Sequence, residues 1–174
     1  AENPDTSDDR LYFTVLDVGQ GLSVLVSCQG KTLLFDGGDA DYSSFVVSYL
    51  KQHNIQFLDY VVASHYDADH LNGVIGAIQA FPVGTVLGPD YEHDSQLYQS
   101  FLSSVSEKGL TVSHPQPGNQ YSLGDATFTV LAPSVITEDS NNNSIAIRID
   151  YQDTSFLITG DAETDSEQDM IESG

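Results

Sequence analysis

The chain has 174 residues, 40% of them hydrophobic, which suffices for one domain with a buried core. Its 26 acidic and five basic residues give a net charge of −21, so long duplex DNA, whose phosphates basic side chains must neutralise, is disfavoured as a partner. The single cysteine excludes an internal disulfide, and no apolar run is long enough for a membrane-spanning segment.

Residues 1–10 are polar and acidic and have no hydrophobic period, which predicts a flexible acidic tail ahead of a domain over 11–174. The chain begins with alanine, which indicates a processed or engineered start. An acidic tail of this kind resembles the segment that lies directly after a removed signal or lipoprotein anchor. We therefore expect an extracytoplasmic protein, either secreted or anchored at the surface.

Strand and helix patterns alternate along the chain. Three β-branched runs separated by tight turns cover residues 11–36 and predict a meander. Helical spacing of apolar residues over 41–53, 70–81 and 95–109 alternates with strand-like runs at 57–64, 84–89 and 110–114. The chain is β-rich over 121–133, 144–151 and 155–161, and 162–173 predicts an acidic helix. This order predicts an α/β sandwich with its chemistry in loops at one edge.

The segment "ASHYDADHLNG", residues 63–73, follows the strand-like run directly and contains His65, Asp67, Asp69 and His70. Imidazole nitrogens and carboxylate oxygens are ligands for zinc, manganese or iron, and four of them within six residues could serve two neighbouring ions. The segment therefore predicts a two-metal hydrolase site. The alternative is a solvated acidic turn.

Five segments in order, "FTVLDVGQG", "LLFDGG", "LDYVVASHYDADHLNG", "NNNSIAIRIDY" and "FLITGDAE", resemble the metallo-β-lactamase superfamily, and within it the ComEC-type competence branch. The resemblance implies a four-layer α-β-β-α sandwich with a metal site between the sheet edges, and usually a metal-dependent hydrolase. The family's last histidine, in an "HHGS"-like segment, has no counterpart before residue 174. We therefore expect a C-terminally truncated domain that lacks its last strand and helix, which leaves a sheet edge exposed.

The resemblance also implies roles for individual residues. It gives the metal ligands as His65, Asp67, Asp69, His70 and Asp161, with Asp69 and Asp161 in catalysis and Asp36 orienting the ligand loop behind them. Asp67 replaces a family histidine, which shifts the preference from zinc toward harder ions such as manganese. The alternative for Asp161 is a turn cap.

Asn142 and Asn143 lie where many family members have a third histidine, and we place them behind the ligands. An amide binds metals weakly, so we expect up to two divalent ions in an intact domain but weak or partial occupancy here. The alternatives are a polar turn before a strand and, because "NNS" is a sequon, a glycosylation site.

Other polar residues carry weaker signals. Among the remaining histidines, only His93 lies in a loop that could reach the site. The acidic run from Asp36 to Asp41 lacks the spacing of a calcium loop. Ser64 next to His65 is not expected to form a nucleophilic pair, because adjacent strand residues point to opposite faces.

The expected function is metal-dependent hydrolysis, most readily of phosphodiester bonds, with nuclease activity implied by the competence branch alone. The charge favours a small anionic or neutral substrate, or a short single strand, because two divalent ions would leave the chain strongly anionic. The alternative is a non-catalytic binding module with a degenerate metal site. Lactam or thioester hydrolysis is disfavoured, because those branches keep both loop histidines.

Overall fold

The computed structural model describes residues 9–173, so the predicted tail over 1–10 lies almost wholly outside the described residues. Within 9–173 the chain forms two sheets and four α-helices. The larger sheet has the strand order β1 (Leu11–Val15), β2 (Val24–Cys28), β3 (Lys31–Phe35), β4 (Leu58–Val62), β5 (Val83–Leu87), β6 (Val112–Ser113). The smaller sheet has the order β10 (Thr154–Ile158), β9 (Ala146–Tyr151), β8 (Ala126–Ala132), β7 (Gln120–Leu123).

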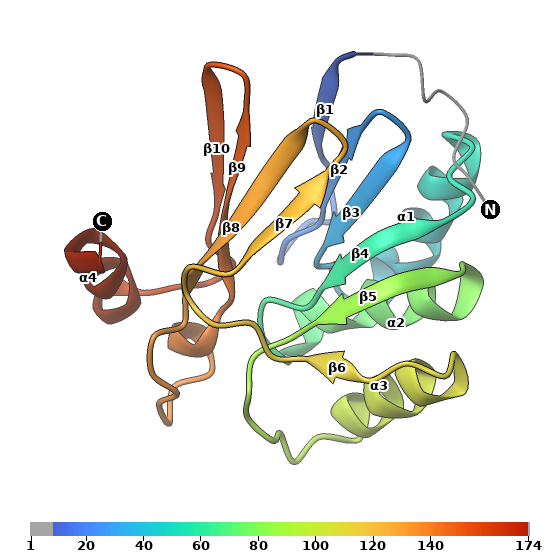
Figure 1. The fold of residues 1–174 in the computed structure, drawn as a ribbon. Coiled ribbons are helices and arrows are strands. Elements are labelled where there is room, and N and C mark those ends of the chain that lie inside the picture. The colour runs from blue at the N-terminus through green and yellow to red at the C-terminus, as the bar shows by residue number, and fades with distance from the viewer. Residues whose placement is uncertain (1–8, 174) are drawn as a thin grey trace.

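The larger sheet is antiparallel from β1 to β3 and parallel from β3 to β6. Each parallel connection needs a crossover, which the helices α1 (Ala40–Gln52), α2 (Ala68–Ala80) and α3 (Gln96–Glu107) supply on one face of the sheet (Figure 1). Local chemistry sets the helix ends: α2 stops before Pro82, and Gly109, with a φ of +71°, follows the end of α3. The carboxyl-terminal ends of α2 and α3, and the helical type of all three elements, therefore agree with the sequence predictions.

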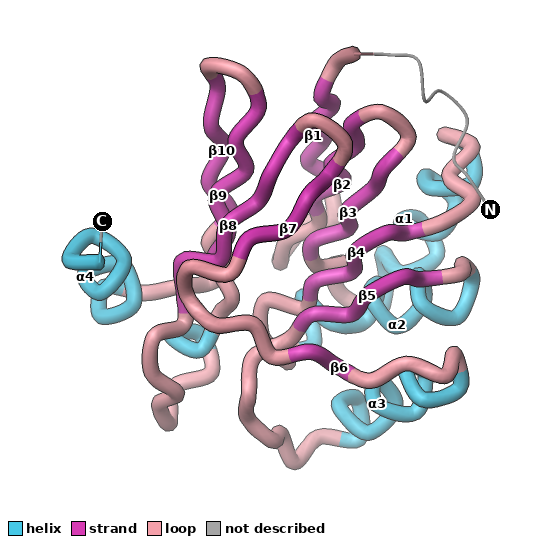
Figure 2. The backbone as a smooth tube through the Cα atoms, viewed as in Figure 1, coloured by secondary structure: helices cyan, strands magenta, loops and turns pink. Residues whose placement is uncertain are grey.

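The smaller sheet is antiparallel throughout. Figure 2 shows it lying across the larger sheet on the side away from α1, α2 and α3. The predicted β-rich segment 121–133 is divided into β7 and β8 by a turn at Gly124, whose φ is +63°. The acidic helix α4 (Thr164–Ser173) follows β10 and contacts β8.

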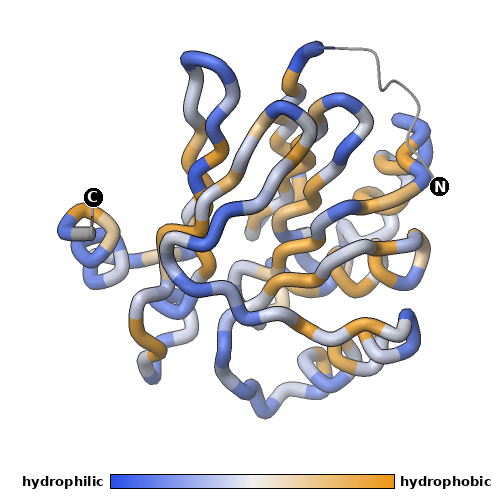
Figure 3. The backbone as a smooth tube through the Cα atoms, viewed as in Figure 1, coloured by the Kyte–Doolittle hydropathy of each residue, from blue (hydrophilic) through white to orange (hydrophobic). Residues whose placement is uncertain are grey.

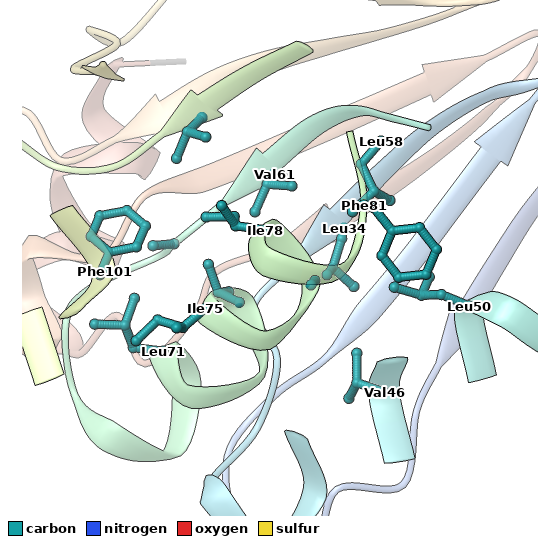
Figure 4. Packing of buried hydrophobic residues seen from close by; sticks show 14 of the residues in the cluster. Leu34, Val46, Leu50, Leu58, Val61, Leu71, Ile75, Ile78, Phe81 and Phe101 are labelled. Atoms are coloured by element: carbon teal, nitrogen blue, oxygen red, sulfur yellow. The ribbon is translucent and has the colours of Figure 1, made fainter. Parts of the chain in front are cut away.

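Two apolar layers hold the sandwich together. Between the larger sheet and its helices, Leu71, Ile75 and Ile78 of α2 pack toward Val61 of β4 and Leu34 of β3 (Figure 4). Between the two sheets, the buried residues include Phe35, Val62, Phe128 and Ile147. Figure 3 shows the hydrophobic stretches along the central strands and hydrophilic residues at the turns. Residues of β3 and β4 contribute to both layers, and the candidate site lies just beyond the carboxyl ends of these two strands.

Two further predictions concern a membrane-spanning segment and an exposed sheet edge. Among residues 9–173, no helix combines the length and apolar character needed to cross a bilayer. The strand β10 is an edge strand of the smaller sheet, and its residue Leu157 is 58% exposed.

Candidate metal centre

Three connections bring the candidate ligands together at one edge of the sandwich. Asp36 follows β3, the segment Ser64–Asp67 joins β4 to α2, and Asp161 follows β10 of the other sheet. The backbone N–H of Ile145 donates to the carbonyl of Ser64 over 2.8 Å, which ties the approach to β9 to the ligand segment. The site therefore lies where the two sheets meet.

His65, His70 and Asp161 form the centre of the cluster. Their potential ligand atoms lie within 4.8 Å of one another, and the two imidazole rings are 4.3 Å apart. Both histidines are fully buried, and their Nε2 atoms have no hydrogen-bond partner. Nε2 of His70 is 3.2 Å from Oδ1 of Asp161, an ion-pair distance without the alignment of a hydrogen bond. Two orphaned buried nitrogens beside a carboxylate are a donor set that suits a divalent cation.

His70 is oriented by Asp36. Its Nδ1 lies 2.8 Å from Oδ2 of Asp36, which also accepts the hydroxyl of Ser64, while Oδ1 accepts the backbone N–H of Ser64. Because Asp36 is a buried carboxylate, Nδ1 of His70 donates to it and Nε2 faces Asp161. This arrangement is the carboxylate–histidine pairing found behind many metal ligands.

His65 is oriented by two serines. Its Nδ1 lies 2.9 Å from Oγ of Ser64 and 3.3 Å from Oγ of Ser144. Since the hydroxyl of Ser64 already donates to Asp36, the hydrogen-bond network assigns the proton to Nδ1 of His65 and leaves Nε2 as the free lone pair. The backbone N–H of Asp161 donates to Oγ of Ser144, so the same network reaches the second sheet.

The prediction that Ser64 and His65 point to opposite faces, away from each other, is wrong. The alternation of side chains holds along a strand, but β4 ends at Val62, and the two residues lie in the turn beyond it. Ser64 is fully buried and donates to Asp36, so its hydroxyl orients a ligand.

The two histidines have opposite pKa shifts. Burial, reinforced by the charge of neighbouring His70, lowers the pKa of His65. Burial alone would also lower the pKa of His70, but its hydrogen bond to Asp36 and the negative charges of Asp36, Asp161 and Asp69 raise it to about 9. In the metal-free protein at neutral pH, His70 is therefore the protonated ring, with Nδ1 hydrogen-bonded to Asp36 and Nε2 only at ion-pair distance from Asp161.

Asp67 and Asp69 lie at the margin of the cluster. Oδ2 of Asp67 is 3.7 Å from Nε2 of His65 and accepts the hydroxyl of Ser140, and Oδ2 of Asp69 is 4.0 Å from Nε2 of His70. Asp67 is the N-cap of α2 but makes no capping hydrogen bond, which leaves its carboxylate turned to the site. The helix begins at Ala68, two residues before the predicted start at His70, so His70 lies in its first turn.

The two asparagines point elsewhere. The amide of Asn143 is buried and bonds the backbone of Thr137 through both its oxygen and its nitrogen. Oδ1 of Asn142 accepts the backbone N–H groups of Glu163 and Ser166, at the beginning of α4. Their hydrogen bonds fix the loop before β9 and the start of α4.

Three residues near the cluster were not predicted. Gln20 donates to Oδ2 of Asp69 over 3.3 Å, Ser140 donates to Asp67, and Ser144 lies between His65 and the Asp161 backbone. Serine and glutamine are common in loops and carry no spacing signal. Gln20 and Ser144 belong to two of the recognised segments, "FTVLDVGQG" and "NNNSIAIRIDY", and they could have been singled out there.

Of the remaining histidines, one lies near the site and two lie elsewhere. His93 reaches the site, with its Nε2 3.9 Å from Oδ1 of Asp67. His53 stacks on Tyr49 of α1, and Nδ1 of His114 contacts the backbone of Gly88.

Comparison with known proteins identifies the family and the fold. The family model described as the metallo-beta-lactamase superfamily matches residues 16–173. The chain belongs to the metallo-beta-lactamase superfamily. This membership confirms the resemblance and the α/β fold drawn from the sequence.

Curated members of the superfamily resemble the chain along most of its length. It is 30% identical over 159 residues to recombination protein 2 of Haemophilus influenzae, covering 88% of the chain and 18% of the relative. It is 29% identical over 166 residues to the competence protein ComA of Neisseria gonorrhoeae, covering 94% of the chain and 22% of the relative. The chain thus spans about a fifth of the length of these relatives.

A solved member shares the fold. A metallo-beta-lactamase with a HARLDQ motif from Cronobacter sakazakii superposes with a TM-score of 0.57 at 15% identity, over 86% of this chain and 58% of that one. The fold is therefore one on which hydrolases are built.

Proposed function

We propose that the chain is a metal-dependent hydrolase that acts on phosphodiester bonds. The observation that carries the proposal is the pair of buried, unpartnered Nε2 atoms of His65 and His70 facing Asp161. Such groups are costly in a folded protein unless something satisfies them. When bound, a divalent cation supplies Lewis acidity and lowers the pKa of water.

The five candidate ligands divide into two groups. His65 and Asp67 would hold one ion, and Asp69, His70 and Asp161 a second. Asp36, Ser64 and Ser144 hold the rings so that each Nε2 points into the site. Three carboxylates with two imidazoles suit manganese as well as zinc. Asp69 and Asp161 are the carboxylates that we assign to catalysis, since both face the site from its solvent side.

Names of relatives and net charge together narrow the substrate. Relatives named for recombination and competence support a substrate related to nucleic acid. The charge of −21 opposes a long duplex. A short single strand, or a small anionic or neutral phosphodiester, fits both. The competence relatives also support an extracytoplasmic location, which surface labelling of intact cells tests.

A binding module on the same fold is the second candidate. The observation that favours it is the direction of Asn142 and Asn143, whose amide oxygens bond backbone N–H groups away from the cluster. No side chain of the described segment Asn141–Asn143 then completes the first group of ligands, and weak metal binding would result.

Metal titration combined with turnover separates the two candidates. Calorimetry with Mn²⁺ and Zn²⁺ is run on the wild type, on Asp161→Asn and on the control His53→Gln, and each protein is assayed on bis(p-nitrophenyl) phosphate. The enzyme requires metal binding and turnover that Asp161→Asn loses and His53→Gln keeps. Metal binding without turnover favours the binding module, and no metal binding by the wild type overturns the metal centre itself.

A further inference from the structure

A cavity of about 530 Å³ lies beside the candidate metal centre. Two loops line it: residues 91–94, between β5 and α3, and residues Thr137, Glu138, Ser140 and Asn143, before β9. Asp67 connects the metal centre to two of the lining residues: it accepts the hydroxyl of Ser140 over 3.2 Å, and its Oδ1 lies 3.9 Å from Nε2 of His93. The cavity therefore lies within reach of a molecule held by the metal centre.

The first wall is tied to the ligand segment. Tyr66, which stands between His65 and Asp67, donates its backbone N–H to the hydroxyl of Tyr91 and its own hydroxyl to the carbonyl of Pro89. Tyr66 is 1% exposed, so these bonds lie in the core. The second wall is closed by the buried amide of Asn143, which bonds the backbone of Thr137 on both sides. Both walls are thus formed before any substrate binds.

His93 presents a fixed hydrogen-bond donor at the boundary. Its Nδ1 accepts the backbone N–H of Ser95 over 3.2 Å and lies 2.8 Å from Oγ of Ser95. That Oγ already accepts the backbone N–H of Tyr98, so its own proton points to Nδ1. The hydrogen of the neutral ring is therefore on Nε2. The 3.9 Å from Nε2 to Asp67 is beyond hydrogen-bond distance, so this N–H is available to a ligand.

The negatively charged side chains that line the cavity disfavour a group that carries a phosphate of its own. Glu92, Asp94 and Glu138 line it, and no lysine or arginine is among its lining residues. Thr137 and Ser140 add hydroxyl groups. The volume suits a nucleoside-sized group, and the wall chemistry suits one with hydroxyl and N–H groups but no phosphate.

We propose that this cavity binds the leaving group of the substrate, that the leaving group is an uncharged nucleoside, and that His93 donates a hydrogen bond to its oxygen. The proposal rests on the proposed phosphodiesterase function and specifies the substrate: a phosphodiester whose alcohol side carries no further phosphate.

Three substrates test it on the full chain loaded with Mn²⁺. Thymidylyl-thymidine has a nucleoside on each side of one phosphodiester. The same dinucleotide with a phosphate on both ends adds negative charge to either nucleoside. The third substrate, bis(p-nitrophenyl) phosphate, has a leaving group that needs no hydrogen-bond donor. We expect wild-type kcat/KM to be about tenfold higher for thymidylyl-thymidine than for the terminally phosphorylated form. Glu138→Gln should reduce this tenfold preference, because it removes one of the carboxylates that line the cavity.

His93→Ala should lower kcat/KM for thymidylyl-thymidine about tenfold, as expected for the loss of one hydrogen bond, and leave bis(p-nitrophenyl) phosphate within about twofold. His114→Ala is the matched control, because His114 is similarly exposed and its Nε2 is also 3.9 Å from a carboxylate, that of Asp90. A second measurement needs no turnover: thymidine should shift the NMR signals of residues 91–94 and 137–143 in the wild type, and less in His93→Ala.

The outcomes distinguish this proposal from the function on which it rests. Turnover of bis(p-nitrophenyl) phosphate with no preference between the two dinucleotides overturns the leaving-group site and leaves the hydrolase standing. An equal loss on all three substrates in His93→Ala, or no thymidine shift in the cavity loops, also overturns it. Failure of the wild type to cleave any of the three overturns the hydrolase, and the leaving-group assignment with it.

Discussion

Oδ2 of Asp36 lies 2.8 Å from Nδ1 of His70, and both side chains are fully buried. Asp36 follows β3, and His70 lies in the first turn of α2, so the contact holds the helix against the sheet as well as orienting the imidazole ring. The backbone N–H of Gly37 adds a 2.8 Å bond to the carbonyl of His70. The orientation of His70 is therefore built into the packing of α2.

Asp36→Asn should weaken both metal binding and stability. The carboxylate accepts three donors, one on Oδ1 and two on Oδ2. An amide has one oxygen, so its NH₂ group must face at least one of these donors. We expect metal affinity to fall about 10- to 100-fold, and unfolding free energy by about 1–3 kcal/mol. Calorimetry and urea denaturation measure the two effects.

Asp125→Asn is the control for this substitution. Asp125 is exposed in the turn between β7 and β8 and accepts a hydrogen bond from Gln29. The same loss of charge there should change metal affinity less than twofold, as expected for a surface charge. Equal losses in the two variants would mean that net charge, and not the Asp36–His70 contact, controls binding.

Metal binding should depend on the proton of His70. The pKa of His70 is raised to about 9, so at pH 7 an ion that takes Nε2 must displace a proton. We expect about one proton to be released at pH 7 when the ion that His70 holds is bound, and the affinity for that ion to rise with pH up to about 9. Calorimetry in buffers of different ionisation enthalpy measures the release, and no release at pH 7 would show that His70 is not a ligand.

The same shift predicts how stability changes with pH in the chelator-treated protein. Because the folded pKa of His70 lies above its unfolded value of 6.5, its contribution is complete below pH 6.5 and is lost as the pH rises through about 9. The difference in melting temperature between the wild type and His70→Gln should follow that curve. If the difference in melting temperature instead grows between pH 7 and 9, the contact of His70 with Asp36 does not stabilise the protein in this way.

Close packing of two glycines holds the loop after β3 against α2. A Cβ on Gly73 would meet the carbonyl of Gly37 closer than real Cβ contacts occur, and backbone cannot rotate away. Gly73→Ala should therefore cost about 1–3 kcal/mol and weaken metal binding by moving His70. In the matched variant Gly76→Ala, the Cβ would meet only the Oγ of Ser43, which can rotate. That variant should be neutral, or gain up to about 1 kcal/mol in helix propensity. Thermal melting compares the two, and equal melting temperatures would refute this role for the glycine contact.

Local patterns were enough to predict the elements and the ligand segment. The helical spacing over 41–53, 70–81 and 95–109 arises from a single buried face, and α1, α2 and α3 form there. His65 and His70 stood out because imidazoles next to carboxylates after a buried strand have few other uses. The resemblance also predicted that Asp161, which lies far along the chain from His65, joins the same edge.

The parts that were not predicted depend on long-range contacts. The hydrogen bond between Ser64 and His65 forms because β4 ends two residues before Ser64, a boundary that a residue pattern cannot locate so finely. The direction of Asn143 depends on the backbone of Thr137. The tautomer of His93 depends on Ser95, whose hydroxyl also caps α3. Each is a choice among hydrogen-bond partners that only the folded backbone supplies.

The loop before β2 offers a test of how closely the site is packed. Gly21 has a φ of +90°, and a Cβ there would collide with the backbone carbonyl of Asp69, while neighbouring Gln20 donates to the Asp69 carboxylate. Gly118 has nearly the same φ, +87°, with no atom within 4 Å of a Cβ. Alanine at either position costs about 1–2 kcal/mol for the left-handed backbone. Only Gly21→Ala should also displace Asp69, so we expect its metal affinity to fall about tenfold or more while Gly118→Ala keeps wild-type affinity. Calorimetric titration of both variants with Mn²⁺ decides the matter, because equal affinities would show that the position of Asp69 does not limit metal binding.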